Sequence, residues 1–171
     1  MNNTIWRTLG RFVLLMALQL LVLNYVYLGG YVMPLLYVLF ILMLPTDTGR
    51  IPMLLISFGT GLLVDIMSGA LGFNALACTV VAMMRILFAD RILTRGEPVV
   101  IQRPSIYSVT PQHFIFYLLL MLGAFFFVIY ATELFGFRGL GGVLLATICS
   151  TLVTTILAII YQLIFLKKEE A

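Results

Sequence analysis

The chain has 171 residues, of which 63% are apolar and only 10% are charged, and its formal net charge is +3. A soluble domain has about 45–50% apolar and about 25% charged residues, and a chain this short cannot bury so much apolar surface in one core. The composition therefore excludes a soluble globular domain, a disordered chain and a disulfide scaffold. It predicts a small, all-α integral membrane protein with a single membrane domain, residues 1–171.

Charge-poor apolar runs predict six transmembrane helices, since a bilayer core of about 30 Å needs roughly 17–25 residues per helix. In chain order, the predicted spans are residues 12–28, 31–44, 51–68, 73–89, 114–135 and 140–166. The first run has no A-x-A-like cleavage site after it, so we expect an uncleaved helix. The second run is short, because its residues would rise only about 21 Å as a helix. It must borrow flanking residues, thin the bilayer or re-enter it.

The positions of the basic residues predict that both termini are cytoplasmic. With six spans and the N-terminus inside, nine basic residues fall on the inner side and one on the outer side, which is the positive-inside distribution. The inner ones are Arg7, Arg11, Arg50, Arg85, Arg91, Arg95, Arg103, Lys167 and Lys168, and the outer one is Arg138. Arginines spread over the membrane ends form no basic face, so we expect no nucleic-acid partner. The predicted cytoplasmic loop, residues 90–112, is either a solvated loop or a contact for a partner or anionic lipid.

Few residues could support catalysis or metal binding. Cys78 and Cys149 lie inside predicted spans without a CxxC motif, and the single histidine, His113, stands where the loop enters span five. A metal site needs several ligands, and nucleophilic catalysis needs a nucleophile with an adjacent base. We therefore expect no enzymatic activity and no cofactor.

Predicted span six carries small residues at every fourth position, a pattern that lets membrane helices approach closely. This candidate helix-packing face consists of Gly142, Ala146, Ser150, Thr154 and Ala158, and a second row beside it holds Thr147, Thr151 and Thr155. Weaker patterns of this kind in spans three and four predict that spans three, four and six pack together, although the face could also receive another protein's helix. Span five is rich in Phe and Tyr, and we expect it to face lipid or a partner's transmembrane helix.

Asp65 is the one ionisable residue well inside an apolar run, about 20 Å along its predicted helix. A carboxylate at this depth costs a few kcal/mol unless it is paired, hydrated or protonated. Its candidate partners are Ser68, Asn74 and Arg138. Both a structural role at the tight turn that follows and a binding role remain open for this residue.

That turn contains two glycines, Gly69 and Gly72, which supply the backbone freedom it needs. The surrounding stretch reads GLLVDIMSGALGFNALA over residues 61–77. In its G-L-L-x-D-x-x-S-G-x-x-G-x-x-A-L block, the chain resembles the MreD family of bacterial rod shape-determining proteins. The likeness covers nearly the whole chain in layout and is specific between about residues 59 and 85.

The resemblance implies a non-enzymatic scaffold subunit of the peptidoglycan-synthesising elongation machinery, the elongasome. Such a subunit is a multi-pass protein of the bacterial inner membrane and helps to maintain cell shape. The resemblance implies MreC as the direct partner, within the lipid bilayer, and RodA with its transpeptidase and MreB filaments as indirect partners. It also implies a membrane fold similar to the substrate-binding subunits of energy-coupling-factor vitamin transporters.

Residue by residue, the resemblance transfers only a candidate structural or partner-contact element, namely Asp65, Ser68, Gly69, Gly72 and Asn74. Asn74 stands where many relatives are expected to have histidine. The alternative function is that of the substrate-binding membrane subunit of a vitamin transporter. In that case Asp65, Asn74, Glu133 and Arg138 would supply polar groups to an outward cavity.

Overall fold

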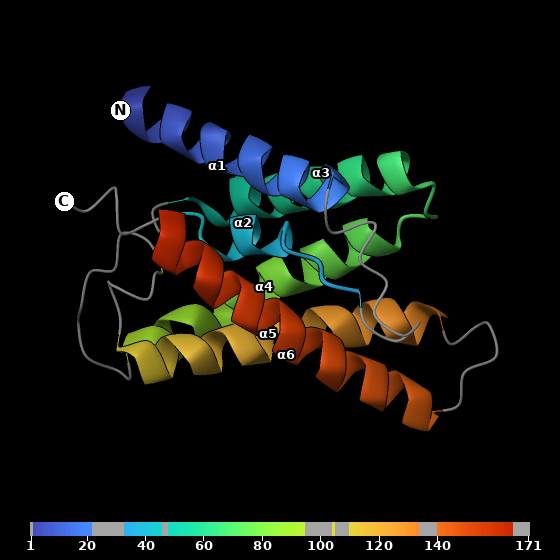
Figure 1. Cartoon of the computed structure of the whole chain (residues 1–171). Coiled ribbons are helices and arrows are strands. Elements are labelled where there is room, and N and C mark those ends of the chain that lie inside the picture. Colours follow the sequence, from blue (N-terminus) through green and yellow to red (C-terminus); the bar gives the residue numbers. More distant parts are fainter. Residues whose placement is uncertain are drawn as a thin grey trace.

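The computed structural model describes residues 2–21, 33–45, 48–94, 104, 110–133 and 140–165. Within these ranges the chain forms six helices and no strand, so the prediction of an all-helical fold is confirmed. The helices are α1 (Asn2–Leu21), α2 (Val38–Leu42), α3 (Arg50–Ser68), α4 (Phe73–Thr94), α5 (Pro111–Glu133) and α6 (Leu140–Phe165). The long helices run back and forth along one direction of a bundle, and α1 begins at the same end at which α6 finishes (Figure 1).

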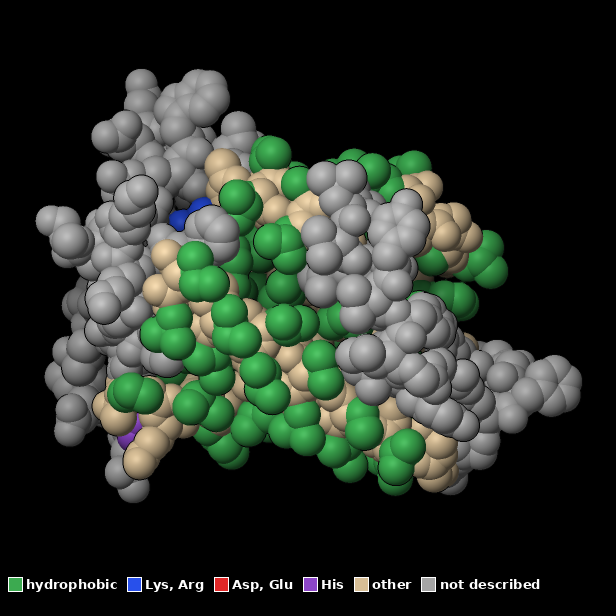
Figure 2. Space-filling model, viewed as in Figure 1, with side chains coloured by type: hydrophobic (Ala, Val, Ile, Leu, Met, Phe, Trp, Pro, Cys, Tyr) green, Lys and Arg blue, Asp and Glu red, His purple; other side chains and the backbone are tan. Residues whose placement is uncertain are grey.

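Three helices of the described part are long and apolar enough to cross a membrane. They are Arg50–Ser68, Pro111–Thr132 and Gly141–Ile164, and two shorter apolar stretches, Gly10–Gln19 and Phe73–Ala89, accompany them. Large apolar side chains such as Ile51, Ile66 and Ile148 are well exposed on the outside of the bundle. Figure 2 shows one face on which the described side chains are mostly hydrophobic. A contiguous exposed apolar surface of this kind indicates a membrane protein.

The helix ends differ from the predicted span ends at several places. Helix α1 begins ten residues before predicted span one, and α4 continues to Thr94, five residues past predicted span four. Helix α5 begins at Pro111, a position where proline loses no helical hydrogen bond. Residues at both ends of the predicted loop 90–112 are therefore helical, and most of that loop lies outside the described residues.

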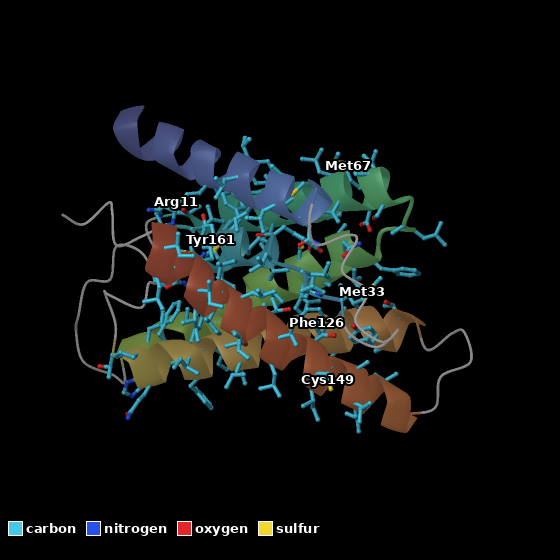
Figure 3. All side chains as sticks on the ribbon, viewed as in Figure 1. Arg11, Met33, Met67, Phe126, Cys149 and Tyr161 are labelled. Atoms are coloured by element: carbon cyan, nitrogen blue, oxygen red, sulfur yellow. The ribbon has the colours of Figure 1, made fainter. Side chains whose placement is uncertain are left out.

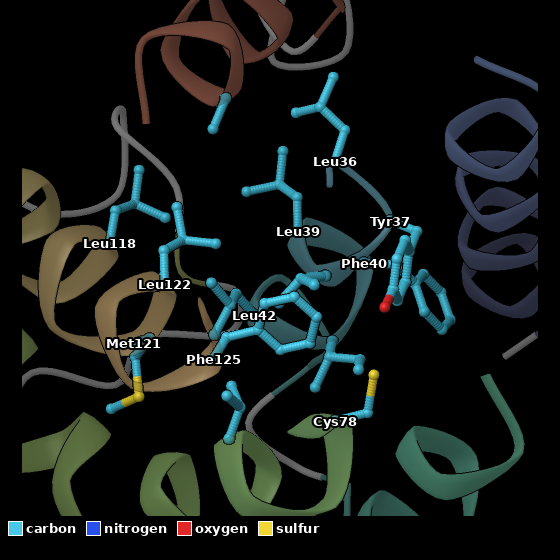
Figure 4. Packing of buried hydrophobic residues seen from close by; sticks show 14 of the residues in the cluster. Leu36, Tyr37, Leu39, Phe40, Leu42, Cys78, Leu118, Met121, Leu122 and Phe125 are labelled. Atoms are coloured by element: carbon cyan, nitrogen blue, oxygen red, sulfur yellow. The ribbon is translucent and has the colours of Figure 1, made fainter. Parts of the chain in front are cut away.

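Helix α2 has only five residues, so the transmembrane helix predicted at 31–44 is absent from the described residues 33–44. Five residues rise about 7 Å, and Pro34 and Pro45 bound the surrounding non-helical segment. Every side chain from Leu36 to Leu44 is nevertheless buried, because α2 contacts α1, α4 and α5. Figure 4 labels five of these side chains, Leu36, Tyr37, Leu39, Phe40 and Leu42, next to buried residues of α4 and α5.

Helix α5 lies between α4 and α6, and the expectation that it faces lipid fits only its exposed side, which carries Phe116, Leu120 and Phe127. Nine of its large side chains are buried: Phe114, Tyr117, Leu118, Met121, Leu122, Phe125, Phe126, Ile129 and Tyr130. The reason is the shortness of α2, since the rings of α5 fill the interior around it. The ring of Phe125, for example, meets that of Tyr37 edge-on, with centroids 6.0 Å apart.

The expected packing of spans three, four and six is right for the first two and wrong for the third. Helices α3 and α4 form a closely packed antiparallel hairpin, whereas α6 packs mainly against α5. Because α5 occupies the place beside α4, the small-residue face of α6 reaches α5 instead.

Candidate functional site

Asp65, near the end of α3, is buried against the first turn of α4. Its Oδ1 accepts hydrogen bonds from the backbone amide of Asn74 at 3.1 Å and from Asn74 Nδ2 at 2.9 Å. Its Oδ2 accepts one from the backbone amide of Ala75 at 2.8 Å. The first amides of a helix have no partner within the helix, and the N-terminus attracts negative charge. Asp65 therefore caps α4 from another helix.

The turn between α3 and α4 places the carboxylate there. Helix α3 ends at Ser68 and is capped by Gly69, whose φ of 68° is left-handed, and the Ala70 amide bonds to the Asp65 carbonyl at 2.9 Å. Gly72, with φ of 89°, directly precedes α4 and has no side chain with which to cap it. Glycine adopts such φ values without steric cost. The two glycines thus let the chain reverse and leave the capping role to Asp65.

Gly61, one turn before Asp65, lets the two helix backbones touch. A Cβ at this position would lie 2.5 Å from Ala75 Cα and 2.6 Å from the Asn74 carbonyl oxygen. Any side chain would push the hairpin apart at the point where Asp65 reaches the α4 amides. The close approach and the cap therefore depend on each other.

Asn74 extends the cluster from the turn into the core. The hydroxyl of Tyr37 donates to Asn74 Oδ1 at 2.8 Å. Tyr37 directly precedes α2 and is completely buried, next to Cys78 (Figure 4). A continuous hydrogen-bonded chain thus runs from Asp65 through Asn74 to Tyr37 and ties the α3–α4 turn to the segment around α2.

A second polar cluster surrounds the C-terminal end of α2. Arg85 is buried in the middle of α4, where Nη1 donates to the Ile41 carbonyl at 2.6 Å and Nη2 donates to the Leu44 carbonyl. The hydroxyl of Tyr117 donates to the Leu42 carbonyl at 3.3 Å. Arg85 was counted among the inner charges, but its side chain is only 3% exposed. Without Arg85, the predicted positive-inside distribution becomes eight inner basic residues against one outer residue.

The segment that leads into α2 is held by residues of α1 and α6. Gln19 Nε2 donates to the Pro34 carbonyl at 3.2 Å, and Gln19 Oε1 accepts from the Leu36 amide at 2.8 Å. Ser150 Oγ accepts from the Met33 amide at 3.4 Å and lies 2.7 Å from the Tyr130 hydroxyl. Both side chains are buried, and both bond to backbone groups that α2 itself does not satisfy.

The structure gathers some of the predicted site residues and separates others. Asn74 bonds to Asp65, whereas Ser68 is exposed and its hydroxyl donates to the Val64 carbonyl of its own helix at 2.6 Å. Gly69 and Gly72 shape the turn and bond through their backbone alone: the Gly69 amide donates to the Asp65 carbonyl, and the Gly72 carbonyl accepts from the Leu76 amide at 3.1 Å. Arg138, the third candidate partner of Asp65, lies outside the described residues, as does the Glu133 side chain.

The predicted packing face of α6 lies toward the interior. Ala146, Ser150, Thr154 and Ala158 are buried, and Gly142 is half-buried. The opposite face exposes large apolar side chains at the same spacing, namely Leu144, Ile148, Leu152, Ile156 and Ile160. In the second row, the Thr155 hydroxyl bonds to the Thr151 carbonyl at 2.7 Å. Burial of the small face accords with close helix packing in membranes.

Sequence reasoning missed Gln19, Gln162 and the packing roles of Tyr37 and Tyr117. The two glutamines carried a usable signal, because each is an uncharged polar residue inside a long apolar run, where a polar side chain requires a partner. Gln162 is fully buried, and its Nε2 lies 3.7 Å from the Met43 sulfur. The tyrosines carried no such signal, since the sequence does not show that their rings turn inward.

The described residues contain no group of three or more His, Cys, Asp or Glu side chains that could hold a metal ion. The buried polar side chains described above instead bond to helix ends and to the turn between α3 and α4. No protein-family model, no curated protein and no solved structure matches the chain.

Proposed function

We propose that the chain is a non-enzymatic, multi-pass scaffold subunit of the bacterial cell-wall elongation complex, located in the inner membrane and binding MreC. RodA with its transpeptidase and the MreB filaments are then its indirect partners. The proposal combines the resemblance of residues 61–77 to the MreD family with the arrangement of the polar residues in that block. It requires both chain ends to be cytoplasmic, and the common location of the α1 start and the α6 end supports this (Figure 1).

The observation that carries the proposal is the set of bonds made by Asp65. Its two oxygens accept three hydrogen bonds from the first turn of α4. A carboxylate used in this way holds the α3–α4 hairpin in one shape, which suits a protein that presents helices to neighbours. A general acid or base would instead need a position within reach of a substrate proton.

Co-purification tests the proposal directly. The full chain with an affinity tag, expressed together with MreC and extracted in mild detergent, should retain MreC. The Asp65→Leu variant should still insert, because removing the charge eases partition into lipid, but should retain less MreC because the hairpin loses its cap. Ser68→Ala serves as the matched control, since the Ser68 hydroxyl bonds only within α3. Failure of the intact, folded wild-type chain to retain MreC would contradict the proposal.

The same purified protein distinguishes the scaffold from the alternative, a vitamin-binding transport subunit. A bound vitamin at a hundred times its Kd would stabilise the chain by about 2.7 kcal/mol, which a thermal melt detects. We expect no vitamin to raise the melting temperature. Two of the residues considered for that site, Asp65 and Asn74, bond to each other in the hairpin.

A further inference from the structure

Residues 33–45, which we call the plug, are the least self-supporting part of the core. Only five of these residues are helical, and a helix of this length has too few internal hydrogen bonds to persist alone. The plug is nevertheless buried almost throughout. Its position must therefore be set by the groups that surround it.

Polar side chains from the long helices bond to both ends of the plug. Gln19 holds its beginning, where Pro34 and Leu36 supply the backbone groups. Arg85 and Tyr117 hold its end, where they donate to three carbonyls, those of Ile41, Leu42 and Leu44. We call Arg85 and Tyr117 the arginine clamp.

The two ends of the plug face opposite ends of the bundle. Figure 3 labels Met67, two residues after Asp65, at the end of the bundle that carries the α3–α4 turn, and Tyr161, the neighbour of Gln162, toward the other end. Tyr37 bonds into the Asp65 cluster on the turn side, and Gln162 lies beside Met43 on the opposite side. The plug therefore spans the interior between two polar clusters.

We propose that residues 33–45 are a buried plug clamped at its end and that the arginine clamp is the contact that keeps the plug in place. Hydrogen bonds from a charged donor are about twice as strong as neutral ones, and the last carbonyls of a helix have no partner within it. The plug in turn supplies two carbonyl acceptors to the buried guanidinium, and the loss of acceptors from a buried charge is strongly unfavourable. Loss of Arg85 should thus release the plug while the long helices remain packed. The inference goes beyond the scaffold proposal and does not depend on any partner.

Cys78 is a built-in reporter for release of the plug. The chain has two cysteines, and Cys78 is fully buried beside Tyr37 (Figure 4). With Cys149→Ala in place, a membrane-permeant maleimide can react only at Cys78. An accessible Cys78 therefore means that the plug has moved away from α4.

The experiment compares maleimide labelling rates of the full chain in detergent. Arg85→Gln should accelerate labelling of Cys78 by about tenfold to a hundredfold, the effect expected when a buried polar contact is lost and a local opening becomes more populated. Arg50→Gln is the matched control, because Arg50 is an exposed arginine at the first residue of α3, and it should leave the rate unchanged. Cys149, measured with Cys78→Ala, should label at the same rate in every variant if the bundle stays folded.

Equal Cys78 labelling in the Arg85→Gln and Arg50→Gln variants would overturn the proposal. A larger acceleration of Cys78 labelling in the Gln19→Leu variant would also overturn it, because the contact at the beginning of the plug would then hold the plug more strongly than the arginine clamp does. If Arg85→Gln does not accumulate, Tyr117→Phe removes one clamp hydroxyl and keeps the ring. It should accelerate labelling by about threefold to tenfold, and an unchanged rate in that variant would also overturn the proposal.

Discussion

Asp65 shows why a charged residue can sit inside this apolar bundle. It occupies the place of a side-chain N-cap for α4, a role that Gly72 cannot fill. The sequence alone predicted that the Asp65 carboxylate lies near a glycine-containing turn and that Asn74 is one of its candidate partners. It could not show that the Asn74 and Ala75 backbone amides are also donors, because that depends on how α4 begins in space.

Replacing Asp65 with alanine should lower the free energy of unfolding. Two helix amides and one side-chain amide would lose their acceptor, and each buried unsatisfied group costs about 1–3 kcal/mol. Chemical or thermal unfolding in detergent measures the loss. Ser68→Ala should change stability by less than about 0.5 kcal/mol, and a loss equal to that of Asp65→Ala would contradict the capping role.

Gly61→Ala should destabilise the hairpin, whereas Gly59→Ala should not. A Cβ at Gly61 meets backbone atoms of α4, and a Cβ at Gly59 meets nothing within 4 Å. Overpacking of this kind costs about 1–3 kcal/mol, while alanine for glycine in an open helix position is neutral or stabilising. Melting temperatures of the two variants provide the comparison, and equal values would show that α3 and α4 are further apart than described.

At the scale of elements, the sequence pattern predicted the packing of some helices and not of others. Small residues at every fourth position identified the interior face of α6, because that pattern reflects packing directly. The aromatic residues of α5 did not show which side of the helix is buried, since large apolar side chains suit both lipid and a protein core. The length of α2 was also not readable, because its ends are satisfied by side chains from helices distant in sequence.

Phenylalanine substitutions on α6 test which face is packed. Ala146→Phe and Ser150→Phe should unfold the bundle or strongly reduce its yield, because both positions are buried in the contact with neighbouring helices. Ile148→Phe, on the exposed face, should be tolerated. The measurement is the fraction of monodisperse protein after extraction. Tolerance of all three variants would place the small-residue face of α6, with Ala146 and Ser150, against lipid.

At the scale of the whole molecule, the bundle predicts the sidedness of its ends. Helix α1 starts where α6 ends, and the α3–α4 turn lies at the opposite end (Figure 1). Reporters fused to the two chain ends should therefore report the same compartment, the cytoplasm under the positive-inside rule. A reporter inserted after Gly69 should report the other side, and export of a C-terminal reporter would overturn this topology.

The sequence by itself determined the membrane class, the long helices and the polar hairpin between α3 and α4. Those features depend on local composition and on short spacings between residues, which can be recognised in the sequence without knowledge of the fold. Only the tertiary structure decided that residues 33–45 are a buried plug, that α5 is central and that Arg85 is a clamp. Each of those depends on contacts between residues far apart in the chain, as in the 44-residue separation between Ile41 and Arg85, and such contacts leave no periodic trace in the sequence.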